Sequence, residues 1–283
     1  MPATQTQHPV EDFFHRALTA HLPPPLFRKL RETTVLMGGV GGGSNIAELM
    51  ARKGFGHIIV TDLDVYEPHN IRQRCSLAST LGKEKVLETE KRLYDVNPHI
   101  RVTPVREGVT LDNVDGLVRK SDIVVDMLDL HAIREKIALH RACRKQGKWV
   151  LTAPSVINGA VLLVFPPDGM TFEEFTGYDE KQPLGAQAWS LLKRMIPRFP
   201  DEAPAELYEE ASHGRRTIPL DAVGVDQAAV LVTAAAENLV LGRLERVVAV
   251  PRGIYLDVSN PGRMVTIADW NRFQEAAHAE HCA

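Results

Sequence analysis

Short apolar runs alternate with helical patterns along the first half of this 283-residue chain. The runs are rich in Val and Ile, which is typical of strands buried on both faces of a parallel sheet. The predicted strands are Thr33–Met37, His57–Thr61, Ile100–Pro104, Ile123–Met127 and Trp149–Thr152. The helical patterns between them are Ser44–Lys53, Lys83–Tyr94, Leu111–Arg119 and His131–Lys145. This β-α-β-α order predicts a doubly wound, Rossmann-like α/β fold with a mostly parallel sheet and a ligand site at the C-terminal strand ends.

Helices and an antiparallel extension flank this core, which we place at residues 33–166. Residues 1–32 form a predicted N-terminal helical segment, with helices at Glu11–His21 and Pro25–Glu32. Residues 167–283 follow the strand-like run Pro154–Pro166 and form a predicted C-terminal helical and antiparallel segment. Its predicted helices are Gln187–Met195, Pro204–Ala211 and the apolar, buried Val223–Leu241, and its predicted strands are Val247–Val250, Ile254–Val258 and Met264–Ile267.

Composition and charge exclude several classes of protein. Hydrophobic residues make up 44% of the chain and charged residues 24%, as in an ordinary globular protein. The formal net charge of −3 provides no overall basic field for nucleic acid or an anionic membrane. The longest apolar runs, such as Val156–Pro166, are too short to span a bilayer, and no secretory signal pattern opens the chain. We therefore expect a soluble, cytoplasmic protein.

A glycine-rich turn, Gly38–Ser44, connects the first predicted strand to a helix. Such a turn lets backbone N–H groups approach a phosphate at the positive end of the helix dipole. The alternative is a tight turn that binds nothing. The second strand ends at Asp62, with Asp64 close behind, and an acidic residue there commonly accepts a ribose hydroxyl. To this point NAD, FAD and ATP all remain possible ligands.

The loop after Asp62 separates these ligands. It is polar and basic through Arg74, where a dehydrogenase would begin another helix, and the next helix opens with Leu-Gly-Lys-Glu-Lys-Val. The fourth strand ends in Asp126-Met-Leu-Asp129. Carboxylates at two strand ends, with Arg and Lys between them, suit ATP and Mg²⁺ better than a nicotinamide.

These segments together resemble the ThiF/MoeB/HesA adenylating enzymes, bacterial relatives of the ubiquitin-activating enzymes. The resemblance covers residues 33–166 well and the remaining tail only in outline. It is carried by VLMGGVGGGSNIAELMARKGFGHIIVTDLDVYEPHNIRQR, LGKEKV, VNPHIRV and DMLDLHAIR. It implies that residues 33–166 are an adenylation core that binds ATP and Mg²⁺. In such enzymes a carboxylate attacks the α-phosphorus of ATP and forms an acyl-adenylate, with release of pyrophosphate.

The resemblance also implies roles for single residues. Gly41, kept together with Gly43, would lie against the nucleotide, and Asp62, followed by Asp64, would hold the ribose. Asn70 and a following arginine would contact phosphates, as would Lys85, and Asp129 would hold Mg²⁺. The family also uses an arginine from the N-terminal region of a partner subunit, for which Arg16 is the best local match. A homodimer is the implied assembly.

The identity of the phosphate arginine depends on a one-residue deletion. The family loop usually reads Asn-x-x-Arg-Gln, whereas this chain reads Asn70-Ile-Arg-Gln-Arg74. The spacing from Asn70 to Lys85 is also one residue shorter than in the family. A single deletion explains both differences and makes Arg72 the phosphate arginine, with Arg74 as the alternative.

Cysteine usage departs from the family most clearly. Many relatives carry two Cys-x-x-Cys pairs for a structural zinc and a nucleophilic cysteine on a crossover loop. This chain has no cysteine between Cys143 and Cys282. We therefore expect neither zinc nor an enzyme thioester. Cys75 and Cys143 are expected to pack as small buried apolar residues.

Three functional hypotheses follow. The leading one is ATP-dependent adenylation of the C-terminus of a ubiquitin-like carrier protein or a peptide, without an enzyme thioester. The second is adenylation of a small molecule or nucleoside that drives dehydration or cyclisation. The third is a non-catalytic scaffold subunit, which the unusual Val40, Leu130 and shifted arginine favour.

Overall fold

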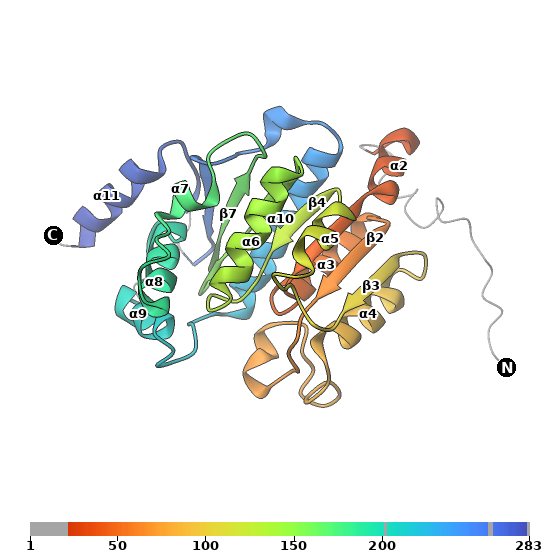
Figure 1. Cartoon of the computed structure of the whole chain (residues 1–283), viewed down its shortest axis with the longest axis horizontal. Coiled ribbons are helices and arrows are strands. Elements are labelled where there is room, and N and C mark those ends of the chain that lie inside the picture. Colours follow the sequence, from red (N-terminus) through yellow and green to blue (C-terminus); the bar gives the residue numbers. More distant parts are fainter. Residues whose placement is uncertain (1–21, 201–202, 260–262, 282–283) are drawn as a thin grey trace.

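The structure is a computed structural model that describes residues 22–200, 203–259 and 263–281. A single sheet with the strand order β3-β2-β1-β4-β5-β7-β8-β9 forms its centre, and β6 pairs with β7 beside it. Helices cover both faces of this sheet (Figure 1). The predicted doubly wound α/β fold is therefore confirmed, with an antiparallel extension at one side of the parallel core.

The parallel half of the sheet matches the predicted strands closely. Its strands are β1 (Thr34–Gly38), β2 (His57–Thr61), β3 (Arg101–Val105), β4 (Ile123–Asp126) and β5 (Trp149–Thr152). Their registers place Gly38 of β1 beside Thr61 of β2 and Asp126 of β4. Because all three strands run in the same direction, the residues that follow them meet at one edge of the sheet.

The helices of the parallel half also follow the predictions, with shifts at their starts. They are α3 (Gly43–Lys53), α4 (Lys85–Val96), α5 (Val114–Arg119) and α6 (Ile133–Lys145). Helix α5 begins three residues after its predicted start, behind a turn that Thr110 and Asn113 close by hydrogen bonds to one another. The backbone N–H of Thr110 donates to Asn113 Oδ1, and that of Asn113 donates to Thr110 Oγ1.

The antiparallel half contains two corrections. Its strands are β6 (Ser155–Val156), β7 (Gly159–Phe165), β8 (Gly253–Asp257) and β9 (Arg263–Ile267). The run 154–166 is a hairpin rather than one strand, since Ile157 adopts φ 46° and turns the chain back on itself. The run Val247–Val250, predicted as a strand, forms none, because Pro251 follows it and has no N–H to extend a ladder.

The remaining helices enclose the two halves. They are α2 (Pro24–Glu32), α7 (Phe172–Thr176), α8 (Leu184–Met195), α9 (Ala205–Ser212), α10 (Ala222–Val240) and α11 (Trp270–His281), with 3-10 turns η1 (Pro68–Arg72) and η2 (Leu244–Arg246). Neither α7 nor α11 was predicted from the sequence. The predicted helix Glu11–His21 lies outside the described residues.

The sheet separates two cores. One contains the buried faces of α3, α4 and α10, and the other contains those of α5 to α8. Among the described helices α10 alone is long and apolar enough to cross a membrane, but 61% of its apolar window is buried inside the fold. It packs on β7 and α3, and Gly224 in its first turn touches the carbonyl of Ile157, where a side chain would clash.

Candidate nucleotide site

The glycine turn lies at the centre of the edge where β1, β2 and β4 end. Gly39 adopts φ 92° and lies so close to the next loop that a Cβ atom would sit 2.5 Å from the carbonyl oxygen of Met127. Only glycine fits both the left-handed backbone and this contact. The turn therefore packs directly on the loop that carries Asp129, and Met127 N–H donates to the Gly38 carbonyl at 2.7 Å.

The turn also presents polar groups that lack partners. Within the described part of the chain, the N–H groups of Gly41 and Gly42 find no hydrogen-bond acceptor. Gln73 lies over Gly41, where a Cβ atom would be 3.1 Å from its Nε2, and its buried Oε1 has no partner. Unpaired amides at a helix N-terminus are a ready anion site. Gly43 instead serves packing, since a Cβ there would be 3.2 Å from Met37.

Asp62 and Asp64 connect the glycine turn to the start of α4 through hydrogen bonds and an ion pair. The carboxylate of Asp62 accepts hydrogen bonds from Val40 N–H at 2.9 Å and Asp64 N–H at 3.0 Å. Burial raises the pKa of Asp62, while the nearby Lys85 opposes that rise. The Lys85 ammonium is buried at the start of α4 and lies 2.9 Å from the carboxylate of Asp64, which is 58% exposed.

The basic loop that follows β2, residues 62–74, is held by contacts within itself, and we call it the arginine loop. Asn70 is buried, and its Oδ1 accepts from Glu67 N–H at 2.9 Å, which closes the 3-10 turn η1. The half-buried Arg72 donates from Nη1 to the His69 carbonyl at 2.6 Å. Its buried Nε has no hydrogen-bond partner. Arg72 thus has an unused donor, whereas the side-chain oxygen of Asn70 is already engaged in the fold of the loop.

Arg74 is held by acidic residues from two helices. Its Nε lies 3.2 Å from Glu48 of α3, in an ion pair that lacks hydrogen-bond geometry, and its Nη2 lies 3.1 Å from Asp226 of α10. Asn45 Nδ2 donates to the same oxygen of Asp226 at 2.7 Å, and Arg92 of α4 donates to the Arg74 carbonyl at 2.8 Å. We call Glu48, Arg74, Asp226, Asn45 and Arg92 the arginine-loop network. This network was not predicted from the sequence.

Asp129 is exposed on the loop between β4 and α6. Its Oδ1 accepts from His131 N–H at 3.0 Å, and its carbonyl accepts from Ala132 N–H at 3.1 Å. These bonds close the turn that leads into α6 and leave the other carboxylate oxygen without a hydrogen-bond partner among the described residues. A single exposed carboxylate suits Mg²⁺, which usually takes one or two protein carboxylates together with phosphate oxygens.

Three residues before it, Asp126 has the opposite environment. It is fully buried, and its carboxylate contacts Lys136 Nζ at 2.7 Å and His140 Nε2 at 2.9 Å, both from α6. Burial alone would raise its pKa, but the Lys136 ammonium and the His140 hydrogen bond lower it to about 2. Burial also lowers the pKa of His140. The signal in the sequence was a Lys and a His one turn apart on the apolar face of α6.

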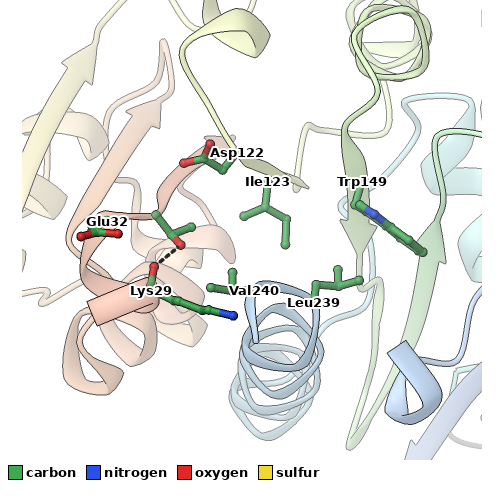
Figure 2. A pocket seen from close by; sticks show the side chains of 8 residues that line it. Lys29, Glu32, Asp122, Ile123, Trp149, Leu239 and Val240 are labelled. Atoms are coloured by element: carbon green, nitrogen blue, oxygen red, sulfur yellow. Dashed lines mark hydrogen bonds between the residues drawn. The ribbon is translucent and has the colours of Figure 1, made fainter. Parts of the chain in front are cut away.

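Other expected residues lie elsewhere. Arg16 lies outside the described residues. Cys75 and Cys143 are buried, as expected, and burial raises the pKa of the Cys143 thiol. A surface pocket lies at the opposite edge of the sheet, where β4 and β5 begin, between α2 and the end of α10 (Figure 2). Its lining, which includes Lys29, Asp122 and Trp149, contains none of the predicted site residues.

A solved structure shares this arrangement of elements. The structure of *E. coli* MccB with ATP superimposes with a TM-score of 0.60 at 19% identity, over 86% of this chain and 66% of that one. At this identity the likeness establishes the fold.

Sequence relatives add the family. The chain is 36% identical over 132 residues to the tRNA threonylcarbamoyladenosine dehydratase of *Bacillus subtilis*, covering 46% of this chain and 51% of the relative. It is 30% identical over 142 residues to the sulfur carrier protein ThiS adenylyltransferase of *Escherichia coli*, covering 50% and 56%. The chain thus spans about half the length of the curated relatives it matches. The ThiF family model matches residues 14–198, more than half of the sequence, so the chain belongs to the ThiF family.

Proposed function

We propose that this chain binds ATP with Mg²⁺ at the C-terminal ends of β1, β2 and β4 and adenylates a substrate carboxylate. The observation that carries the proposal is the set of unused donors at that edge: the N–H groups of Gly41 and Gly42 and the buried Nε of Arg72. The ThiF-family match and a relative named as an adenylyltransferase support it.

Each side chain has a role in this proposal. The phosphates lie on the N–H groups of the glycine turn, and Arg72 and Lys85 neutralise their charge. Asp62 accepts a ribose hydroxyl with lone pairs that its two backbone donors leave free. Arg72 is preferred over Arg74 because Glu48 and Asp226 already hold the Arg74 guanidinium.

Asp129 is the proposed protein ligand of Mg²⁺. The ion, when bound, supplies neutralisation of the phosphate charge that develops as the leaving group departs. The chain's own contribution is to hold the Asp129 carboxylate beside the glycine turn, through the close contact of Gly39 with Met127. Asn70 keeps the arginine loop folded through its bond to Glu67.

The proposed reaction is an in-line transfer. A carboxylate oxygen of the substrate forms a bond to the α-phosphorus, and the bond to the bridging oxygen of the β-phosphate breaks. Pyrophosphate carries away that electron pair, and the acyl-adenylate then reacts with an external nucleophile. An enzyme thioester is not part of the proposal, since no cysteine occurs between Cys143 and Cys282.

The C-terminus of a ubiquitin-like carrier protein or of a peptide is the proposed substrate. The relative from *E. coli* that acts on the carrier protein ThiS supports this choice. A nucleoside or small-molecule substrate is the second candidate, and the 36% identity to a tRNA-modifying dehydratase favours it. Pyrophosphate release measured with carrier C-terminal peptides and with small carboxylic acids separates the two.

A homodimer completes the proposal, with Arg16 of one protomer at the site of the other. Apolar side chains on the outer face of α10, including Val223 at 44% and Val230 at 55% exposure, support such a contact. A mixture of Arg16→Ala and Asp129→Ala protomers is expected to recover activity that neither variant has alone, because each mixed dimer contains one intact site. No recovery in a mixture shown to exchange protomers would contradict an arginine supplied in trans.

Calorimetric titration with ATP and Mg²⁺ tests the core of the proposal. We expect the wild type to bind and Asp129→Ala to lose most of that affinity. Asp168→Ala is the matched control, since Asp168 is an exposed aspartate after β7, at the opposite edge of the sheet. A folded wild type that does not bind ATP would refute the enzyme hypothesis and favour the scaffold alternative.

A further inference from the structure

A buried charge cluster lies directly behind the loop that carries Asp129. Asp126, at the end of β4, is 0% exposed, and Lys136 and His140, one turn apart on α6, are each 5% exposed. We call these three residues the Asp126 cluster. Among the described residues, none of the other ion pairs joins two side chains that are both so fully buried.

The cluster is tied to the backbone of the loop. Asp126 Oδ1 accepts from Lys136 Nζ at 2.7 Å and also from the N–H of Leu128 at 3.2 Å. Leu128 directly precedes Asp129. On the other side of the loop, Met127 N–H donates to the Gly38 carbonyl at 2.7 Å. Hydrogen bonds therefore attach the short segment 127–129 to the glycine turn on one side and to the Asp126 cluster on the other.

The other side of the cluster touches the segment that follows the core. The His140 ring lies 4.1 Å from the Phe172 ring, with 31° between their planes, and 5.1 Å from the Phe165 ring in an edge-to-face contact. Phe172 is the first residue of α7. The cluster therefore contacts β4, α6, the Asp129 loop and the first helix of the C-terminal segment.

Stability does not account for charge at this place. Taking ionic groups out of water is costly, and apolar residues of similar volume often replace a buried ion pair without loss. A charged network is directional, however, and holds its partners in one geometry. Here the partners include the N–H of Leu128, the residue next to Asp129. The network therefore fixes the backbone that orients the proposed metal ligand.

We propose that Lys136 and His140 are positioning residues, which through Asp126 hold the Asp129 carboxylate at the orientation required for Mg²⁺ and ATP. This inference rests on the proposed function for what Asp129 binds. Lys136 contributes more to this positioning than His140, because the Lys136 ammonium and Leu128 N–H donate to the same oxygen, Asp126 Oδ1. His140 fixes the other oxygen and joins the cluster to α7 through Phe172.

Hydrogen exchange of the apo protein tests the positioning directly. The amide of Leu128 reports the bond to Asp126, and those of His131 and Ala132 report the turn closed by Asp129. In Lys136→Met we expect these amides to exchange about tenfold faster, with exchange in β1 and β2 unchanged. Lys145→Met, on the exposed side of the same helix, is the matched control and is expected to match the wild type.

Binding supplies the second measurement. We expect the Mg²⁺ concentration for half-maximal ATP binding to rise roughly fivefold or more in Lys136→Met, since a mobile ligand binds the ion less well. His140→Gln retains a donor for Asp126 and is expected to stay near the wild type, whereas His140→Leu is expected to follow Lys136→Met. A merely structural role would lower the melting temperature and leave the Mg²⁺ dependence unchanged.

The design separates the two proposals. If the wild type does not bind ATP, the proposed function fails, and the exchange rates still decide whether the cluster orders the loop. If Lys136→Met does not fold, the double variant Asp126→Leu/Lys136→Met replaces both charges with apolar side chains and removes the acceptor of the Leu128 amide, and the same expectations apply. A folded variant with wild-type loop exchange and wild-type Mg²⁺ dependence overturns the inference.

Discussion

Two groups of charged residues flank the glycine turn on opposite faces of the sheet. The Asp126 cluster lies on the face covered by α6, and the arginine-loop network lies on the face covered by α3, α4 and α10. Each holds one loop that carries proposed catalytic residues. The two groups differ in solvent exposure: Asp126 is fully buried, whereas the side chain of Arg74 is 32% exposed and that of Asp226 is 54% exposed.

The difference shows that similar contact distances need not mean similar energies. In the Asp126 cluster no water can replace the lost partner of a buried charge. Removal of one member therefore lowers the free energy of unfolding strongly. At the exposed end of the arginine-loop network, water and salt screen the Arg74–Asp226 pair, so that pair contributes little. We therefore expect the arginine loop to change position more readily than the Asp129 loop.

Removal of the buried carboxylate gives the largest expected effect. Asp126→Ala leaves the Lys136 ammonium buried without a partner, and we expect the free energy of unfolding to fall by about 3–5 kcal/mol. Urea denaturation measures it. Asp168→Ala is the control, expected within about 0.5 kcal/mol of the wild type. A loss below about 1 kcal/mol in Asp126→Ala would show that the two regions do not differ in the way we describe.

Low pH is expected to have the next largest effect on the stability that the Asp126 cluster provides. The folded-state pKa is lowered for Asp126, from 3.8 to about 2, and for His140, from 6.5. The unfolded chain therefore binds these protons first, and stability falls as pH falls below 6.5 for His140 and below 3.8 for Asp126. The Asp126 contribution corresponds to roughly 2 kcal/mol, lost between about pH 4 and pH 2.

The His140 part is testable at mild pH. Thermal or urea denaturation between pH 6.5 and pH 5 should show a smaller loss of stability in His140→Gln than in the wild type, because the variant lacks the titrating group. His213→Gln, at an exposed histidine after α9, should follow the wild type. Equal slopes in all three proteins would count against a neutral, buried His140.

Replacement of Arg72 and of Arg74 should affect nucleotide binding differently. Arg72→Ala removes the unpaired donor, and we expect ATP affinity to fall about tenfold or more, as for the loss of a charged hydrogen bond. Arg74→Ala is expected to lower affinity less than about threefold, since its guanidinium is engaged by Glu48 and Asp226. Arg52→Ala, which also contacts Glu48, is the control. The reverse ranking would make Arg74 the phosphate ligand.

The smallest effect is expected at the outer end of the arginine-loop network. Asp226→Asn weakens one half-exposed ion pair with Arg74, and we expect the free energy of unfolding to change by less than about 1 kcal/mol. The difference should shrink further as NaCl is added, because salt screens exposed charges. Denaturation at low and high salt checks this, and a salt-independent loss above about 2 kcal/mol would place Asp226 with the buried cluster.

Elements with a strong local signal were predictable. The strands β2 and β5 have the predicted bounds, because their runs of apolar residues end at polar positions. The helix α7 was missed although Thr171 and Glu174 form a capping box that the sequence displays. The strand Val247–Val250 was wrong because its apolar run lies beside Pro251, which ends pairing.

The candidate site was predictable only in part, for a physical reason. The glycine turn, Asp62, Lys85 and Asp129 follow predicted strands or open predicted helices, so their shared edge follows from topology. The networks that hold them join distant residues. Asn45 and Asp226 are 181 positions apart, and Asp126 and His140 are 14 apart on different elements. Nothing in the local sequence pairs them.

The sequence by itself determined the α/β class, the parallel core and the edge where its candidate functional residues meet, since apolar periodicity and strand direction are local properties. Tertiary structure alone decided the environments at that edge. It buried Asp126 between Lys136 and His140 while exposing Asp129 three residues later. It paired Arg74 with Glu48 and Asp226, whereas no carboxylate pairs with Arg72 among the described residues. Burial and ion pairing depend on which distant helices pack beside a residue, and that is settled only when the whole chain folds.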